Sequence, residues 1–167
     1  MYWGQAMQTV NDAIVEFKKG SSQIEALYQA VCQSMITNIG STRASVWSFN
    51  IGGDQITCEM LLDTRTGKFS SGTVLKEEDF PEYFEVMKTR GKIMATDAVT
   101  HPATACFDDI YFTPLDIRSL LDTVVMEGKR PAMVLCCEHC ETKKDWTLKH
   151  IQYLMEVGST LSSELNR

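Results

Sequence analysis

The stretch IRSLLDTVVMEGKRPAMVLCCEHC, residues 117–140, decides the fold of this chain. It holds two runs rich in apolar residues, 117–127 and 130–140, separated by Gly128 and Lys129. Such runs on either side of a two-residue turn predict a β-hairpin, in which the two strands pair antiparallel. The centre of the fold is therefore expected to be an antiparallel sheet that contains this hairpin.

The rest of the chain supplies further strands and several helices. Strands are expected over residues 42–50 and 55–63, which a tight turn at 52–54 joins, and over 92–96. Helices are expected over 6–19, from Ser22 to near Gly40, from Glu78 or Asp79 to near Gly91, and from Thr147 onward. Residues 97–116 are too irregular for one element and are interpreted as a loop with a short helix around 104–112. Antiparallel strands with helices at both termini predict an α+β fold.

Length and composition limit the classes of function. The 167 residues are 44% hydrophobic and 23% charged, which predicts one domain with a substantial core. A net charge of −6 without a basic patch argues against nucleic-acid binding. No secretory signal and no membrane-spanning run are visible, so the six cysteines are expected to be reduced thiols in the cytoplasm. Helices at both ends suggest a piece of a longer protein.

An ordered set of short motifs resembles one known family. The motifs are RASVWSF (43–49), GG (52–53), DA (97–98), HPAT (101–104), SLLD (119–122), CCEH (136–139) and WT (146–147). In this order they resemble a GAF domain, of the subtype found in bacterial sensor histidine kinases and related signalling proteins. The resemblance covers roughly residues 20–165. It implies an N-terminal signalling or dimerisation helix, 1–19, and a sensory domain, 20–167, that includes the C-terminal helix.

The resemblance also implies an architecture and a function. An antiparallel sheet of five or six strands would carry the terminal helices on one face. The helix at 79–90 and the irregular segment would roof a small-molecule pocket on the other. The implied function is that of a cytoplasmic sensory module, not an enzyme, that binds an unidentified small molecule. It would pass a signal to an output domain such as a histidine kinase, without a cofactor or a membrane partner. Because fold does not settle function, the site is considered separately.

The stretch CCEHC, residues 136–140, raises the possibility of a metal or redox site. In a strand, Cys136, Glu138 and Cys140 point to one face and Cys137 and His139 to the other. A metal needs several ligands that converge on one point, so no metal is expected here. Buried free cysteine is common, and the favoured interpretation is that Cys136 and Cys137 fill core space as small apolar residues.

Two other functions stay open. A thiol-dependent reductase of the free-methionine-sulfoxide type would use Cys106 in the irregular segment and an acid at Glu138. However, Cys136 stands where another acid is expected, and no second loop cysteine accompanies Cys106. A ligand-free dimerisation module with a filled pocket is the other alternative. A bilin is not expected, because the chain has no Cys-His dipeptide.

The candidate ligand-binding residues come from the strands, where the alternation of side chains gives their faces, and from the irregular segment 97–116. Arg43, Trp47, Asp122 and Glu138 share the pocket face if the strands pair as expected. Apolar walls are expected from Trp47, Phe49, Phe107 and Tyr111, and polar groups from Asp97, Asp122 and Glu138. Alternatively, Arg43 pairs with Asp122 or Glu138 as a structural ion pair, since buried carboxylates need partners. Both can hold at once.

The terminal helices carry stripes that favour a homodimer. In the first helix the stripe is Met7, Val10, Ile14 and Phe17, and in the last it is Ile151, Leu154, Gly158, Leu161 and Leu165. Both have the spacing of a coiled-coil seam. Leu148 and Met155 would extend the face that the last helix turns to the sheet. A two-fold partner could then cover the second stripe.

Overall fold

A computed structural model describes residues 3–165. Within these residues, seven strands form one antiparallel sheet in the order β3-β2-β1-β7-β6-β5, with β4 also paired to β2. The strands are β1 (Arg43–Phe49), β2 (Gln55–Asp63), β3 (Lys68–Ser70), β4 (Val74–Lys76), β5 (Lys92–Ala95), β6 (Ile117–Glu127) and β7 (Arg130–Cys140). The long hairpin of β6 and β7 thus lies inside the sheet, with β1 and β5 on its two sides.

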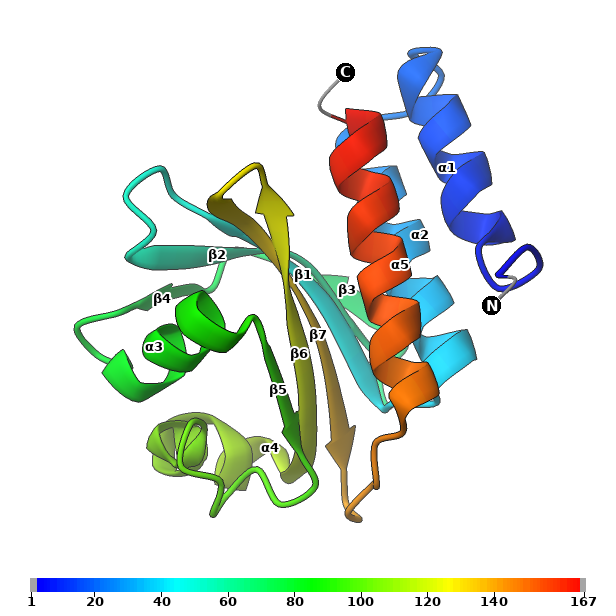
Figure 1. Ribbon diagram of the computed structural model, residues 1–167. Helices are drawn as coiled ribbons and strands as arrows, with labels where there is room; N and C mark the ends of the chain where they lie inside the picture. The colour runs from blue at the N-terminus through cyan, green and yellow to red at the C-terminus, as the bar shows by residue number, and fades with distance from the viewer. Residues whose placement is uncertain (1–2, 166–167) are drawn as a thin grey trace.

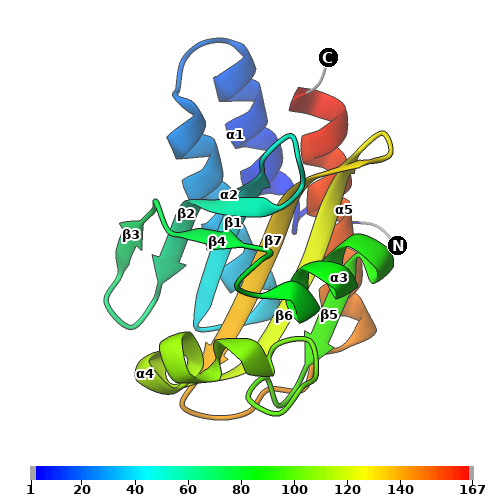
Figure 2. The same ribbon diagram turned by 90° about the vertical axis from the view of Figure 1, so that its left-hand side faces the viewer.

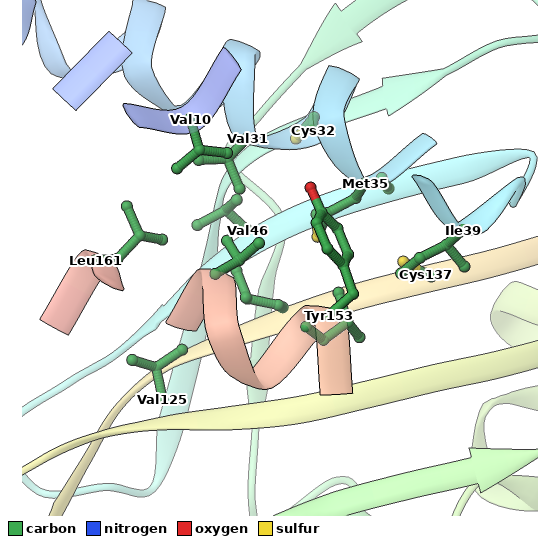
Figure 3. Close-up of a cluster of buried hydrophobic side chains, with 14 of the residues drawn as sticks. Val10, Val31, Cys32, Met35, Ile39, Val46, Val125, Cys137, Tyr153 and Leu161 are labelled. Carbon is green, nitrogen blue, oxygen red and sulfur yellow. The ribbon is translucent and has the colours of Figure 1, made fainter. Parts of the chain in front are cut away.

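Two helices, α2 (Ile24–Ile39) and α5 (Leu148–Leu165), pack on one face of the sheet, and α1 (Gln8–Lys18) lies against them on the side away from the strands, as Figure 1 shows. The helix α2 ends at Gly40, whose φ of 78° is the left-handed conformation that glycine adopts without strain. A continuous apolar core fills the space between these helices and the strands. Figure 3 shows Val10, Val31, Met35, Tyr153 and Leu161 of the helices with Val46, Val125 and Cys137 of the strands.

The other face of the sheet carries α3 (Pro81–Arg90) and a run of short helical turns over residues 105–115. These turns are η1 (Ala105–Phe107), η2 (Asp108–Phe112) and α4 (Thr113–Leu115), and we call them together the roof segment. Figure 2 shows α3 and α4 in front of the sheet, on the side away from α1 and α2. A second apolar core lies under them. The sheet is therefore the middle layer of three.

The structure confirms the predicted class and the strand faces. The hairpin strands have the predicted bounds, and the sheet is antiparallel with the terminal helices on one face. Trp47 and Cys136 lie in the core under the roof segment, whereas Val46 and Cys137 lie in the core under the helices. The expectation of five or six strands missed the short strands β3 and β4, because three residues are too few to show an alternating pattern.

Two details of the helix starts were wrong. The helices α2 and α3 begin at Ile24 and Pro81, later than the predicted starts at Ser22 and at Glu78 or Asp79, and their N-terminal cap positions are Gln23 and Phe80. Neither cap makes a side-chain hydrogen bond to its helix. Pro81 does occupy the first turn of α3, where its missing N–H costs nothing.

The stripes on the terminal helices are buried within the chain itself. Met7, Val10 and Ile14 pack in the same core as Ile151, Leu154 and Leu161, because α1 lies against α2 and α5. The stripes therefore need no second copy to cover them. Leu148 and Met155 were expected to face the sheet, but they are 72% and 54% exposed. The homodimer stays a prediction, and its interface would have to use a surface other than these buried stripes.

The described helices give no sign of a membrane span, since none combines the length and the hydropathy that a bilayer crossing requires.

Candidate ligand-binding site

A cavity of about 180 Å³ lies between the sheet, α3 and the roof segment. Its walls come from β1, β2, β4, β6 and β7 below, and from α3 and the roof segment above. The lining residues are Trp47, Ile56, Thr73, Leu75, Tyr83, Phe107, Ile110, Tyr111, Phe112, Leu120, Asp122, Cys136 and Glu138. Most of them are apolar, and only a few polar groups converge on the space, as in small-molecule sites generally.

Aromatic contacts hold the outer wall of the cavity in place. Phe107 of the roof segment stacks on Phe80 with ring centroids 4.5 Å apart, and it meets Tyr83 edge-on at 5.1 Å. Phe107 also packs against Phe112 at 5.8 Å. Such pairs contribute about 0.5–1.5 kcal/mol each beyond the area they bury. The roof segment is therefore fixed to α3 as well as to the sheet.

Arg43 organises the polar side of the site without lining the cavity. Its Nε donates to Oε1 of Glu138 at 3.0 Å, and its Nη2 donates to the hydroxyl of Tyr111 at 2.9 Å. Its Nη1 donates to Oδ2 of Asp63 at 3.3 Å. Burial raises the pKa of Glu138, although the charge of Arg43 opposes the shift. The guanidinium thus joins β1 to β7, to β2 and to the roof segment.

Asp122 has a different environment. Its side chain is 2% exposed, and the Tyr83 hydroxyl donates to Oδ2 at 2.6 Å. Oδ1 is buried and has no hydrogen-bond partner anywhere in residues 3–165. Burial raises the pKa of Asp122 to about 7, while the Cys136 thiol and the Tyr83 hydroxyl oppose part of this shift. One carboxyl oxygen of this lining residue is therefore buried without a hydrogen-bond partner, and the Cys136 thiol that influences its pKa is only a weak donor.

Five of the eight residues predicted from the sequence line the cavity: Trp47, Phe107, Tyr111, Asp122 and Glu138. Arg43 lies next to them and pairs with Glu138, as the structural alternative predicted, and not with Asp122. Phe49 belongs to the same core but packs edge-on against Phe84, outside the lining. Whether these side chains bind a ligand stays a prediction.

Asp97 does not reach the cavity. Its carboxylate forms an ion pair with Lys143 at 2.9 Å, and both side chains are exposed at the surface. The physical reason is that β5 ends at Ala95, and the chain then leaves the sheet, so strand alternation no longer directs this side chain.

The sequence reasoning missed Tyr83 as a polar group of the site. Tyr83 lies on the buried, apolar side of α3, where the sequence pattern indicates packing and gives no sign of a polar contact. A buried tyrosine, however, needs a partner for its hydroxyl, and Asp122 was the unpaired carboxyl on the facing strand. Thr73 and Leu75 were missed because β4 was not predicted.

The cysteines behave as core residues in this structure. Cys136 and Cys140 lie in the core under the roof segment and Cys137 in the core under the helices, so CCEHC divides between two faces as predicted. Burial raises the pKa of Cys137 to about 12 and that of Cys140 to about 11, which keeps both thiols protonated. The described residues hold no group of three His, Cys, Asp or Glu side chains that could bind a metal ion.

Comparison with known proteins identifies the fold. The GAF domain family model matches residues 23–165. The phycoerythrobilin-bound GAF domain of a cyanobacterial phytochrome is 13% identical, with a TM-score of 0.76 over 99% of this chain and 94% of that one. The GAF domain of a phosphoenolpyruvate-protein phosphotransferase from Coxiella burnetii is 14% identical, with a TM-score of 0.70 over 96% of this chain and 92% of that one.

A longer structure has the same fold in one part. The chromophore-binding domain of Stigmatella aurantiaca bacteriophytochrome is 13% identical, with a TM-score of 0.69 over 99% of this chain. This chain spans 61% of that one. No curated protein matches the sequence. At these identities the solved structures show a shared fold alone.

Proposed function

The chain belongs to the GAF domain family, and on that premise we propose that it is a sensory module. It binds a small molecule in the cavity under the roof segment and passes the occupancy of that cavity to its terminal helices. The observation that carries the proposal is the cavity itself. Its walls are mostly apolar, it opens to solvent beside the exposed residues Thr73 and Ile110, and an ion pair holds one of its carboxylates in a fixed place. Polar groups arranged in advance reduce the cost of ordering when a ligand binds.

The route from the cavity to the helices runs through β6. Asp122 faces the cavity, and its neighbour Leu121 lies in the core under the helices. Farther along the strand, Val125 meets Gly158 of α5 so closely that an added Cβ at Gly158 would lie 2.9 Å from it. Because the two elements are packed this tightly, a ligand that displaces β6 should also displace α5.

The ligand is smaller than a bilin. The similar cyanobacterial domain holds phycoerythrobilin, which is a linear tetrapyrrole. Sites for drug-sized ligands have volumes of about 300–1,000 Å³. The cavity here, at about 180 Å³, lies below that range and favours a smaller molecule. The missing Cys-His dipeptide supports the same choice.

We place catalysis outside the proposal. Cys106 is the cysteine that a thiol reductase would use, and it is partly exposed. Burial and the nearby charge of Glu82 raise its pKa, whereas a nucleophilic thiol needs a lowered pKa. The thiol chemistry therefore favours binding over reduction.

The proposal extends to the surroundings of the module. We infer a cytoplasmic location, with an output domain such as a histidine kinase that receives the signal from α5. A homodimer belongs to the same proposal. Its surface would include the outer sides of the terminal helices, where Val15 and Met155 are exposed apolar residues.

Native mass spectrometry of freshly purified protein tests the function. The wild type should carry a retained small molecule, or should gain one from a panel of small metabolites. The variant Leu120→Phe, which adds bulk at the cavity wall, should lose that adduct. Ile51→Phe is the matched control, because it adds bulk to a side chain that is exposed in the turn between β1 and β2.

Either of two results would contradict the proposal. One is an adduct that survives Leu120→Phe in a folded protein. The other is a wild type that binds no member of the panel more tightly than the filled variant does.

A further inference from the structure

We propose that the cavity takes a small organic cation: a protonated amine on a compact apolar body, whose N–H donates to Oδ1 of Asp122. This inference rests on the proposed function and names its ligand class. It starts from Asp122, a lining residue of the cavity whose Oδ1 is buried and has no hydrogen-bond partner among residues 3–165. Buried polar atoms are nearly always hydrogen-bonded, so a missing partner calls for an explanation.

The charges around the cavity exclude an anion. The two carboxyl groups in the lining are Asp122 and Glu138, and no lysine, arginine or histidine of the described chain lines the space. Arg43 is the nearby cation, but Nε, Nη1 and Nη2 already donate to Glu138, Asp63 and Tyr111. A phosphate or carboxylate ligand would therefore meet two carboxyl groups and no positively charged side chain in the lining.

The charged groups at the cavity also favour a cationic ligand over a neutral one. Glu138 has Arg43 as its counter-ion, whereas Asp122 has the neutral hydroxyl of Tyr83. An ionised carboxylate in an apolar enclosure is costly until a positive charge joins it. A bound ammonium supplies that charge and the missing hydrogen bond together.

The remaining walls suit a cationic headgroup with an apolar body. Trp47, Tyr83, Phe107, Tyr111 and Phe112 all line the cavity. The faces of aromatic rings attract cations, most strongly where water is excluded, and aromatic cages bind alkylammonium groups in this way. Leucine and isoleucine side chains complete the wall and contact the apolar body.

The volume limits the size of the ligand. An apolar cavity of about 150 Å³ holds benzene. The cavity of about 180 Å³ therefore holds one six-membered ring with a short arm. Benzylammonium has this shape, and benzyl alcohol and benzoate differ from it mainly in charge. These three compounds form a matched set of probes.

Isothermal titration calorimetry with the three probes tests the charge. At pH 8 we expect benzylammonium to bind at least about tenfold more tightly than benzyl alcohol, and benzoate to give no detectable heat of binding. Asp122→Asn should weaken benzylammonium by about tenfold and leave benzyl alcohol nearly unchanged. Asp97→Asn makes the same chemical change at a surface ion pair outside the cavity, and should alter nothing.

A pH series on the wild type gives a readout that needs no variant. The titratable groups around Asp122 are Tyr83 from α3, Tyr111 from the roof segment, and Cys136 and Glu138 from β7; β5 contributes the apolar Ile93. With the pKa of Asp122 at about 7, its ionised fraction falls about tenfold between pH 8 and pH 6. The affinity for benzylammonium should fall with it, and the affinity for benzyl alcohol should not.

The results separate this inference from the proposed function. If benzyl alcohol binds as tightly as benzylammonium, or if folded Asp122→Asn binds the cation as the wild type does, the cation is wrong although the cavity still binds ligands. If no probe binds at millimolar concentration, the cation is again wrong. The sensory function is then judged by the retained-ligand experiment alone.

Discussion

Replacing the Asp122 carboxyl by an amide should change how the stability of the fold depends on pH. Asp122 has a pKa of about 7 in the folded chain, against about 3.9 for an aspartate in an unfolded one. Between these values the folded state holds a proton that the unfolded state has lost. The folded state thus binds more protons, so the free energy of unfolding falls as the pH rises.

The size of the change follows from the occupancy of that proton. At pH 6 the folded carboxyl is about nine tenths protonated and at pH 8 about one tenth, while the unfolded one is ionised throughout. Between pH 6 and pH 8 the free energy of unfolding of the wild type should therefore fall by about 1.4 kcal/mol through this carboxyl. Asp122→Asn lacks the carboxyl and should not show this fall. The interval stays above the isoelectric point of about 5.1, where the protein would be least soluble.

Urea unfolding, followed by circular dichroism, measures the difference at each pH. Glu138 and the other titrating groups are present in both proteins, so their contributions cancel in the comparison. Asp97→Asn is the control. Lys143 lowers the pKa of Asp97, so this carboxyl is ionised in the folded and the unfolded chain throughout pH 6–8, and its removal should leave the pH dependence of stability in this interval unchanged. If the stability difference between wild type and Asp122→Asn is the same at both pH values, the reasoning about this carboxyl is refuted.

Three further predictions concern other parts of the fold. Arg43→Leu should lower the free energy of unfolding by about 3–5 kcal/mol in urea titrations, because it leaves Glu138 buried without its counter-ion. Adding Glu138→Leu should restore part of that loss. A double variant less stable than Arg43→Leu would contradict this. Gly158→Ala should lower the melting temperature, since overpacking costs about 1–3 kcal/mol and the new methyl group would clash with Val125. Val125→Ala in the same chain should relieve the clash. If Gly158→Ala has the same effect with and without Val125→Ala, the clash is not the cause. Cys106 is partly exposed and the other five cysteines are buried, so Cys106 should give the fast phase of the reaction with Ellman's reagent under native conditions. Cys106→Ser should remove this phase. An unchanged fast phase in that variant would contradict the assignment.

The sheet was predictable because its signal is local. In β6 and β7 the residues alternate between two buried faces, so the period of two gives the face of each side chain once the hairpin is recognised. That is why Asp122 and Glu138 were assigned to the correct wall. Asp97 was misplaced because it lies in the irregular segment after β5, where no period gives the direction of a side chain.

The helices show where sequence reasoning stops. An apolar stripe predicts that a face is buried but not which surface buries it. Val10 of α1 and Leu161 of α5 belong to one core within a single chain, and nothing in the spacing distinguishes that arrangement from two copies of the chain. The hydrogen bond from Tyr83 to Asp122 was missed for a related reason, because it joins residues that only the tertiary fold brings together.

The strand β6 has a consequence for how such a module changes over time. Its residues turn by alternation to the cavity or to the helices, so a side chain that lines the cavity and one in the core under the helices are one peptide unit apart, as with Asp122 and Leu121. A substitution on the cavity side can alter the shape of the cavity while the side chains under the helices keep their packing. A substitution on the helix side can alter that packing while the cavity keeps its walls. Under the proposed function, selection could thus adjust recognition and response separately within a single β-strand.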